Sequence, residues 1–312
     1  MKKAAVLFVI GLLALSCWSR GSRGSSGLIA LRLEHGGRER ECLMHAPAGA
    51  PSGPRPLLLV LHGGGGTAKG MVGLTGGRFN ELADSAGWYV AYPAGLGKSW
   101  NDLRDDAKGY AHREGIDDTG FLAALIDRLA ADYPIDPGRV FATGISNGGF
   151  MCYRLACELP GKIRAVAAVA ATSPAGMKES CRPARPVSVM IVNGTGDPIV
   201  PYGGGEVTLF GASRGKVAST DDTVSDWVRL DACPKDAEAR DLPDLDPDDG
   251  TRVRVFSYGP CGGGTRVVLY RVEGGGHAWP GGLQYLPAMF IGRTSRDMSA
   301  CDEIWNFFGG LR

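Results

Sequence analysis

One serine of the chain stands in a pattern typical of an activated nucleophile. Residues 144–148 match G-x-S-x-G, with Ser146 at the centre, between a predicted strand at 139–145 and a predicted helix at 147–159. Such a sharp strand-to-helix turn lifts the serine hydroxyl above the sheet, and the two flanking glycine positions must stay small. Ser146 is therefore the candidate nucleophile, although an ordinary glycine-bounded turn gives the same short pattern.

A histidine and an aspartate follow Ser146 in the chain order that this kind of site uses, which is nucleophile, acid and then base. His277 is the only one of the five histidines beyond Ser146, and it follows a predicted strand at 266–272 within a glycine-rich loop. Asp197 follows another predicted strand, at 187–192. We expect His277 to act as general base and Asp197 to orient its imidazole. The nearby alternatives for the acid lie in helical or strand-free sequence, which is more typical of surface charges, and they are Glu206, Asp221, Asp222 and Asp226.

A run of glycines offers donors for the oxyanion that forms in acyl transfer. Gly63 and Gly64 begin this run, one residue after a predicted buried strand at 57–61, and glycine lets backbone N–H groups approach a substrate closely. We expect Gly63, Gly64 and the backbone N–H of Asn147 to form an oxyanion hole. Residues 63–68 also satisfy the dinucleotide pattern G-x-G-x-x-A, but that alternative explains none of the other motifs. The sequence has no Walker, H-E-x-x-H or C-x-x-C pattern, so neither a cofactor nor a catalytic metal is expected.

Strands and helices alternate along the chain, and this alternation predicts how the candidate residues are positioned. Continuous apolar runs of strand length are typical of parallel strands buried on both faces, and apolar residues every three to four positions predict helices. We therefore expect an α/β fold in one domain over 28–312, with a mostly parallel central sheet and helices on both faces. The predicted strands are 57–61, 88–92, 139–145, 164–170, 187–192 and 266–272, and the predicted helices are 117–133, 147–159 and 299–308.

Composition and charge indicate a globular protein and argue against nucleic acid or an anionic membrane as a partner. The chain has 312 residues, of which 44% are hydrophobic and 21% charged, as in a globular protein rather than a disordered one. With 34 Lys and Arg against 33 Asp and Glu, the net charge of +1 gives no electrostatic reason to bind nucleic acid or an anionic membrane. Glycine is unusually frequent, at 48 residues, and much of it lies in the loops assigned to the site. An acidic loop at 241–250 imitates a calcium-binding loop but lacks its closing glutamate, so we interpret it as solvated.

The first residues predict export. Two lysines precede an apolar run at 4–15 that is short for a bilayer-spanning helix, and residues 1–16 have the pattern of a signal peptide. The polar residues at 17–27 then predict a flexible tether. Cys17 leaves a second interpretation open, in which this residue carries a lipid anchor and holds the protein at a membrane.

Eight cysteines in an exported chain predict disulfides. Cys233 and Cys261 bracket the acidic loop and are the first candidate pair. Cys157 and Cys181 are the second candidate pair, and the sequence by itself leaves the connectivity open.

Seven different short motifs follow one another along most of the chain. They are LHGG at 61–64, WND at 100–102, DDTGF at 117–121, SNGG at 146–149, GTGDP at 194–198, GGHAWPG at 275–281 and IWNFF at 304–308. Together they resemble a family of exported esterases that includes small polyhydroxybutyrate depolymerases and feruloyl esterases. The resemblance covers about residues 28–312 and implies an α/β-hydrolase fold with Ser146, Asp197 and His277 as the catalytic triad.

The same resemblance implies that Trp100 and Trp279 form walls of the acyl pocket. Cys42 and Cys301 depart from the Tyr and Thr that relatives often carry at these places, which bears on the disulfide pattern. Asp118 is expected to be structural and to cap the helix that starts there.

These patterns predict a secreted or lipid-anchored serine carboxylic-ester hydrolase that works through an acyl-enzyme. Its expected substrates are polymer-derived esters, either polyhydroxybutyrate-type oligomers or feruloyl and acetyl esters of plant polysaccharide. A serine peptidase of the same fold would use the same three residues but usually carries an extra cap or propeller domain. A non-catalytic surface lipoprotein would require one of the three residues to be missing, and none is.

Overall fold

The computed structural model describes residues 20–23, 27–49 and 53–311. The predicted signal peptide at 1–16, Cys17 and parts of the predicted tether lie outside these residues. Within the stretch expected to be a tether, Arg20–Arg23 form a short strand, β1, which pairs antiparallel with β2 (Ile29–His35).

One sheet of eleven strands runs through the described part of the chain, and its central strands are parallel, as the sequence predicts. Antiparallel pairs flank the parallel strands, β3 with β5 on one side and β13 with β12 on the other. In spatial order the strands are β1, β2, β3 (Arg38–His45), β5 (Tyr89–Pro93), β4 (Arg55–Leu61), β6 (Ile135–Ile145), β7 (Ala165–Val169), β8 (Ser188–Gly194), β13 (Val267–Glu273), β12 (Arg252–Tyr258) and β11 (Glu238–Asp241).

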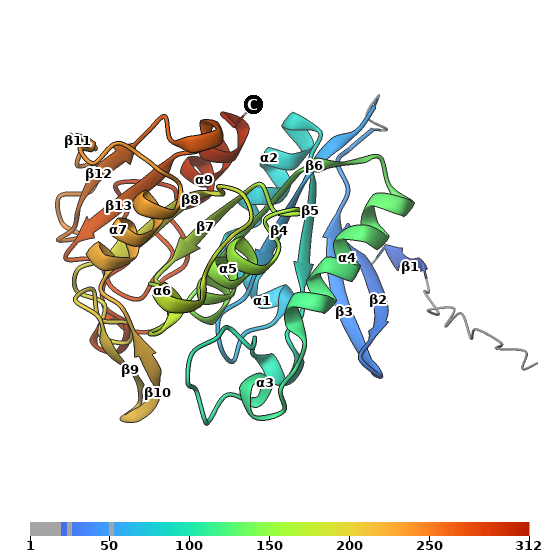
Figure 1. Ribbon diagram of the computed structural model, residues 1–312, viewed down its shortest axis with the longest axis horizontal. Helices are drawn as coiled ribbons and strands as arrows, with labels where there is room; N and C mark the ends of the chain where they lie inside the picture. The colour runs from blue at the N-terminus through green and yellow to red at the C-terminus, as the bar shows by residue number, and fades with distance from the viewer. Residues whose placement is uncertain (1–19, 24–26, 50–52, 312) are drawn as a thin grey trace, which may run out of the picture.

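Helices cover both faces of this sheet (Figure 1), and each face has its own hydrophobic core. In β4, Leu57, Leu59 and Leu61 face one core while Leu58 and Val60 face the other, because successive side chains of a strand point to opposite faces. The first core is covered by α4 (Asp118–Asp132), α5 (Asn147–Glu158) and α7 (Thr220–Leu230). The second is covered by α1 (Ala68–Leu74), α2 (Arg78–Ala86) and α9 (Ala300–Gly309). The short helices are η1 (Leu96–Lys98), α3 (Tyr110–Arg113), α6 (Met177–Ser180), η2 (Gly262–Gly264) and α8 (Ala288–Ile291).

The parallel strands bring the candidate loops to one edge of the sheet. β4, β6, β8 and β13 are in parallel register, so their carboxyl ends and the loops that follow them lie on the same side. Sites in open α/β sheets are built at this edge. The glycine run, Ser146, Asp197 and His277 each follow one of these strands.

The N-cap of α4 differs from the expected one. Asp117, rather than Asp118, caps the helix, because its Oδ1 accepts a hydrogen bond from the backbone N–H of Gly120 at 2.8 Å. Asp118 is fully buried and accepts hydrogen bonds from Arg40 Nη2 at 2.6 Å and from the backbone N–H of Asn101 at 2.8 Å. Asp118 is thus structural as expected, but it ties α4 to the sheet and to the Trp100 loop.

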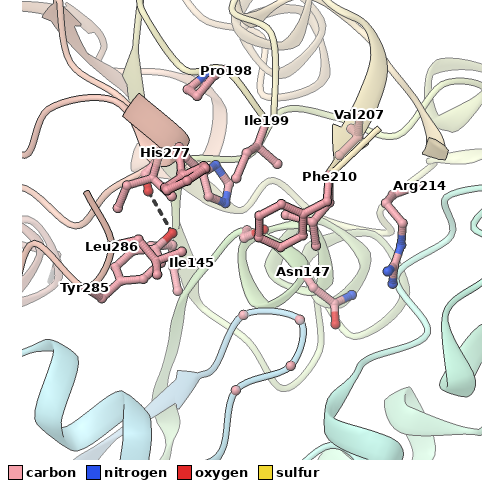
Figure 2. A pocket seen from close by; sticks show the side chains of 18 of the residues that line it. Ile145, Asn147, Pro198, Ile199, Val207, Phe210, Arg214, His277, Tyr285 and Leu286 are labelled. Atoms are coloured by element: carbon pink, nitrogen blue, oxygen red, sulfur yellow. Dashed lines mark hydrogen bonds between the residues drawn. The ribbon is translucent and has the colours of Figure 1, made fainter. Parts of the chain in front are cut away.

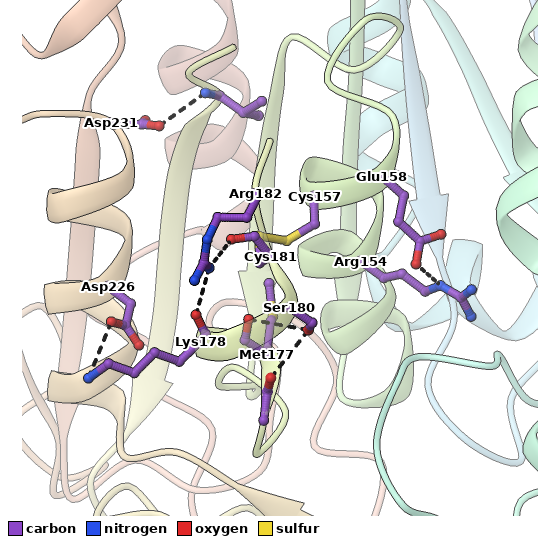
Figure 3. Close-up of a disulfide and its surroundings, with 12 residues drawn as sticks. Arg154, Cys157, Glu158, Met177, Lys178, Ser180, Cys181, Arg182, Asp226 and Asp231 are labelled. Carbon is purple, nitrogen blue, oxygen red and sulfur yellow. Dashed lines mark hydrogen bonds and ion pairs between the residues drawn. A yellow bond between two sulfur atoms is a disulfide. The ribbon is translucent and has the colours of Figure 1, made fainter. Parts of the chain in front are cut away.

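Both candidate disulfides are present. Cys157 at the end of α5 is bonded to Cys181 just after α6, as Figure 3 shows, and Cys233 is bonded to Cys261. Among the described residues the free cysteines are Cys42, Cys152 and Cys301, all of them buried. The pairing expected from the sequence is therefore confirmed.

Each disulfide should stabilise the fold by restricting the unfolded chain. The bonded residues are 24 and 28 positions apart, and cross-links closing loops of this size stabilise by about 3–4 kcal/mol in the chain-entropy model. We expect the double variant Cys233→Ala/Cys261→Ala to lose about this much free energy of unfolding in urea titrations. A loss below about 1 kcal/mol would show that this bond does not restrict the unfolded state as argued.

Candidate active site

The turn at Ser146 brings three backbone segments unusually close together. Ser146 has φ 55° and ψ −121°, a strained conformation for a residue other than glycine. A Cβ on Gly144 would lie 2.6 Å from the carbonyl carbon of Gly148. A Cβ on Gly148 would lie 2.4 Å from the carbonyl oxygen of Leu61, at the end of β4. The two glycines of the motif are therefore required because no side-chain atom fits at either position.

His277 and Asp197 meet across the ends of β13 and β8. His277 Nδ1 lies 2.7 Å from Asp197 Oδ2, and both side chains are buried. The other carboxylate oxygen, Asp197 Oδ1, accepts hydrogen bonds of 2.8 Å from the backbone N–H groups of Ile199 and Val200. Since an ionised carboxylate only accepts, His277 Nδ1 carries the proton and Nε2 is left to act on a neighbour.

The backbone of His277 is also held in place. Its N–H donates to the carbonyl of Ile291 at 2.5 Å, and its carbonyl accepts from the hydroxyl of Tyr285 at 2.9 Å, the dashed line in Figure 2. Burial raises the pKa of Tyr285 well above its usual value, and the nearby charge of Asp197 raises it further. Tyr285 therefore stays protonated and keeps this donation.

Ser146, His277 and the glycine run at 63–66 line the same pocket, with a volume of about 620 Å³. Much of its wall is apolar and comes from outside the central sheet. The apolar residues that line it from outside the central sheet are Ile199, Val207, Phe210, Leu286, Met289 and Phe290, and the exposed side chains of the last four form its mouth. A pocket of this size and character suits a small organic molecule.

A buried histidine holds the glycine run in place. The backbone N–H of Gly95 donates to His62 Nε2 at 2.9 Å, so His62 Nδ1 carries the proton and donates to the carbonyl of Gly63 at 2.8 Å. Burial lowers the pKa of His62 by more than its hydrogen bond to Gly63 raises it, which keeps the imidazole neutral. The carbonyl of His62 accepts from Trp100 Nε1 at 2.9 Å.

Asn147 lines the pocket, and its side chain holds the Trp100 loop in place. Its Oδ1 accepts from the backbone N–H of Trp100 at 2.7 Å, and its Nδ2 donates to the carbonyl of Trp100 and to Asp102 Oδ2. The backbone N–H groups in the first turn of a helix have no intrahelical partner. The N–H of Asn147, at the start of α5, belongs to this first turn.

The two tryptophans expected to form pocket walls do not line the pocket. Both side chains are completely buried. Trp100 packs behind the glycine run, with its ring centroid 5.0 Å from that of His62. Trp279 turns into the core beneath α9 and meets Phe79 edge-on at 6.0 Å. A large indole gains more from complete burial than from a half-open pocket wall.

Several groups that shape the pocket were not expected from the sequence. β9 (Gly205–Leu209) and β10 (Ala212–Val217) form a separate two-stranded hairpin whose tip, Phe210, is 79% exposed. Phe210 meets Phe290 across the mouth, with ring centroids 6.5 Å apart. The only local signal in the sequence is the glycine at Gly211. In the structure Phe210 and Gly211 both have positive φ, as in the turn of a tight hairpin, and glycine favours that conformation.

A buried carboxylate network was also missed. Asp102 is completely buried and accepts hydrogen bonds from Asn147 Nδ2 at 2.6 Å, His112 Nε2 at 2.8 Å and Arg104 Nη2 at 2.8 Å. The WND motif contained Asp102, but its partners are Arg104, in the loop that follows, and His112, on the short helix α3, and no periodicity in the sequence links the three. The network joins the start of α5 to the loop at 100–112.

Other kinds of site find no support within the described ranges. No group of three or more His, Cys, Asp and Glu side chains is arranged there to hold a metal ion. No helix of those ranges has the length and apolar character that crossing a bilayer requires.

No family model matches the chain. A relative named "Putative esterase NocK", from Nocardia uniformis subsp. tsuyamanensis, is 36% identical over 289 residues, which are 88% of this chain and 80% of the relative. The chain belongs to this esterase family. Its members are carboxylic ester hydrolases, as the seven motifs predict.

Two larger relatives match over part of their length. The "Bifunctional acetylxylan esterase/xylanase XynS20E" of Neocallimastix patriciarum is 28% identical over 78% of this chain, and "Feruloyl esterase B" of Piromyces equi is 27% identical over 72%. The matched segments cover 31% and 39% of these two proteins.

Solved structures agree on the fold of this esterase. The acetyl xylan esterase from Aspergillus awamori matches 86% of this chain and 94% of its own, with a TM-score of 0.53 and 15% identity. Esterase PE8 matches 86% of this chain and 99% of its own, with a TM-score of 0.52 and 16% identity. The predicted α/β-hydrolase fold is confirmed.

Removing the carboxylate of Asp102 should destabilise the esterase strongly. Asp102→Ala removes the buried carboxylate that pairs with Arg104 and one of the two acceptors of Asn147 Nδ2, and breaking such a buried ion pair costs about 3–5 kcal/mol. Asp105→Ala is the matched control, because Asp105 lies in the same loop, carries the same charge and is exposed. Urea unfolding should show the full loss for Asp102→Ala and a change within about 0.5 kcal/mol for Asp105→Ala. Equal losses in the two variants would contradict a special role for the buried network.

The contribution of Asp102 should depend on pH. Burial alone would raise the pKa of Asp102, but the charge of Arg104 and the contact with His112 outweigh it, so the pKa lies well below the usual range. With a depressed folded pKa, the stabilisation is complete above the unfolded pKa, about 4, and is lost as the pH falls through the folded pKa. The difference in unfolding free energy between wild type and Asp102→Asn should therefore shrink below about pH 4. A difference that grows on acidification would rule out this account.

Proposed function

We propose that this esterase is a serine hydrolase in which Ser146, His277 and Asp197 form the catalytic triad. The observation that carries the proposal is the arrangement around His277. Its Nδ1 is bound to Asp197, and its ring lines the pocket that Ser146 enters from the sharp turn before α5. This combination supplies a nucleophile, a base and a group that orients the base.

The chemistry then runs through an acyl-enzyme. Ser146 Oγ attacks the ester carbonyl while His277 Nε2 takes its proton. The tetrahedral intermediate collapses, and His277 returns the proton to the departing alcohol. Water then attacks the acyl-enzyme with His277 again as base, which releases the acid and restores Ser146.

The oxyanion of the intermediate would be received by Gly63, Gly64 and the backbone N–H of Asn147. A Cβ on Gly63 would lie 3.5 Å from Ser146 Cβ, so the glycine run is directly beside the serine. His62 and Trp100 hold that run from behind. Donors fixed before the reaction stabilise developing charge without reorganisation, which is the largest single contribution in many such enzymes.

The size of the pocket bears on the substrate. A volume of about 620 Å³ accommodates an acyl group larger than acetyl, and apolar side chains enclose the mouth. Relatives are named as feruloyl and acetylxylan esterases. We propose esters with extended acyl groups as substrates, of which feruloyl esters and hydroxyalkanoate oligomers are two kinds.

Residues 28–312 are proposed as the catalytic domain of a secreted enzyme. The two disulfides support an oxidising environment outside the cytoplasm. Residues 1–16 remain the predicted signal peptide, and Cys17 remains the residue at which a lipid anchor would attach.

Loss of the serine hydroxyl tests the mechanism directly. Ser146→Ala should lower kcat for a short p-nitrophenyl ester and for methyl ferulate by about 10⁴-fold or more, because no acyl-enzyme can form. Ser85→Ala, an exposed serine on α2, is the matched control and should keep wild-type kcat. Turnover of both esters by purified Ser146→Ala at the wild-type rate would overturn the proposal.

A further inference from the structure

The pocket wall carries positive charge without a facing carboxylate. Arg104 and Arg214 both line the pocket, and none of the described residues that line it is Asp or Glu. The carboxylates that balance these arginines, Asp102 and Asp106, lie behind the wall with 0% and 3% exposure. A group entering the pocket therefore meets guanidinium before it meets any negative charge.

Arg214 is held by one nitrogen and leaves the others available. On β10, Arg214 Nε donates to Asp106 Oδ1 at 3.1 Å and to Oδ2 at 3.0 Å. Asp106 is itself fixed, since its Oδ1 accepts from the backbone N–H groups of Lys108 and Gly109. Arg214 Nη1 and Nη2 make no hydrogen bond with any described residue, and the side chain is 27% exposed. The guanidinium is thus oriented in advance with two donor groups unused.

In contrast, each of the three guanidinium nitrogens of Arg104 already donates a hydrogen bond within the protein. Its Nε and Nη2 donate to Asp102, and its Nη1 donates to the carbonyl of Arg214 at 2.8 Å. Arg104 therefore anchors the backbone of β10 at the position that presents Arg214. Of these two arginines, Arg214 is the one free to bind a substrate group.

The position of Arg214 indicates which part of an ester it would meet. Figure 2 shows Arg214 on the opposite side of Asn147 from His277. His277 must reach the oxygen of the departing alcohol to protonate it, so the alcohol lies beside His277. The acyl chain then extends the other way, past Asn147, towards Arg214.

We infer that Arg214 recognises a carboxylate carried by the acyl group, so that the preferred substrates are half-esters of dicarboxylic acids. This inference rests on the proposed function and names, within the esters with extended acyl groups proposed there, a kind that differs from feruloyl esters and hydroxyalkanoate oligomers in carrying a carboxylate on the acyl group. Two N–H groups of one guanidinium match the two oxygens of a carboxylate, a pairing that is short, charge-assisted and specific in geometry. A neutral acyl chain of the same length gains nothing from Arg214.

The experiment compares three esters with wild type and Arg214→Gln. Methyl pentanoate is neutral, monomethyl glutarate carries a carboxylate on the acyl group, and the butanoyl ester of glycolate carries one on the alcohol. Hydrolysis is followed by pH-stat titration. We expect the ratio of kcat/KM for monomethyl glutarate to that for methyl pentanoate to fall by about tenfold or more in Arg214→Gln, as for loss of a charged hydrogen bond.

Lys216→Gln provides the matched control. Lys216 lies on the same strand, is exposed and does not line the pocket, so this change removes the same charge without touching the site. The ratio should stay at its wild-type value in Lys216→Gln. An unchanged ratio in Arg214→Gln, or an equal fall in Lys216→Gln, would overturn the inference. So would a selectivity loss confined to the glycolate ester, which would put the anion on the alcohol side.

A binding measurement keeps this test separate from the proposed mechanism. Calorimetric titration of monomethyl glutarate into Ser146→Ala needs no turnover. We expect Kd to rise by about tenfold or more when Arg214→Gln is added to Ser146→Ala, and to stay unchanged when Lys216→Gln is added. If wild type hydrolysed none of the esters, the catalytic proposal would fail, and this titration would still decide the role of Arg214. An equal Kd with and without Arg214 would overturn the inference.

Discussion

The close approach of the start of α5 to the end of β4 is the constraint on which the site depends. Gly148 lies against the carbonyl oxygens of Leu61 and His62, where a Cβ would lie within 2.6 Å of either oxygen. This contact sets Ser146 beside Gly63 and forces the backbone of Ser146 into its strained conformation. The strain persists because β4 and α5 are both packed into the same core, which leaves the turn no alternative path.

The network behind this turn converts a close contact into a rigid arrangement. Asn147 is hydrogen-bonded to the backbone of Trp100 and to the carboxylate of Asp102, and the indole of Trp100 donates to the carbonyl of His62. The proposed oxyanion donors on both sides of Ser146 are thus tied through one set of buried polar groups. Each of these hydrogen bonds works in a low-dielectric interior, where a satisfied network stiffens the site and a broken one is costly.

Rigid and variable parts of the pocket come from different sources. The proposed catalytic groups follow parallel strands whose register is fixed by the central sheet. The β9–β10 hairpin and the segment around α8 lie outside those strands and supply most of the apolar mouth together with Arg214. Loops that extend from a rigid scaffold can change without disturbing it, so substrate choice is separable here from the reaction itself.

The sequence by itself offered two candidate cysteine pairs, and the tertiary structure decided that both are bonded. The sequence also determined the central strands, the helices on either face and the positions of Ser146, Asp197 and His277 after strand ends. These features follow from local patterns, because a buried parallel strand is a continuous apolar run and its carboxyl end is a fixed edge. Only the tertiary structure decided that Trp100 and Trp279 are buried behind the site rather than in its wall. It also decided that Arg214 reaches the pocket, more than sixty residues after Ser146. Such placements depend on how a hairpin and irregular loops pack against distant segments, and no periodicity in the chain encodes that packing.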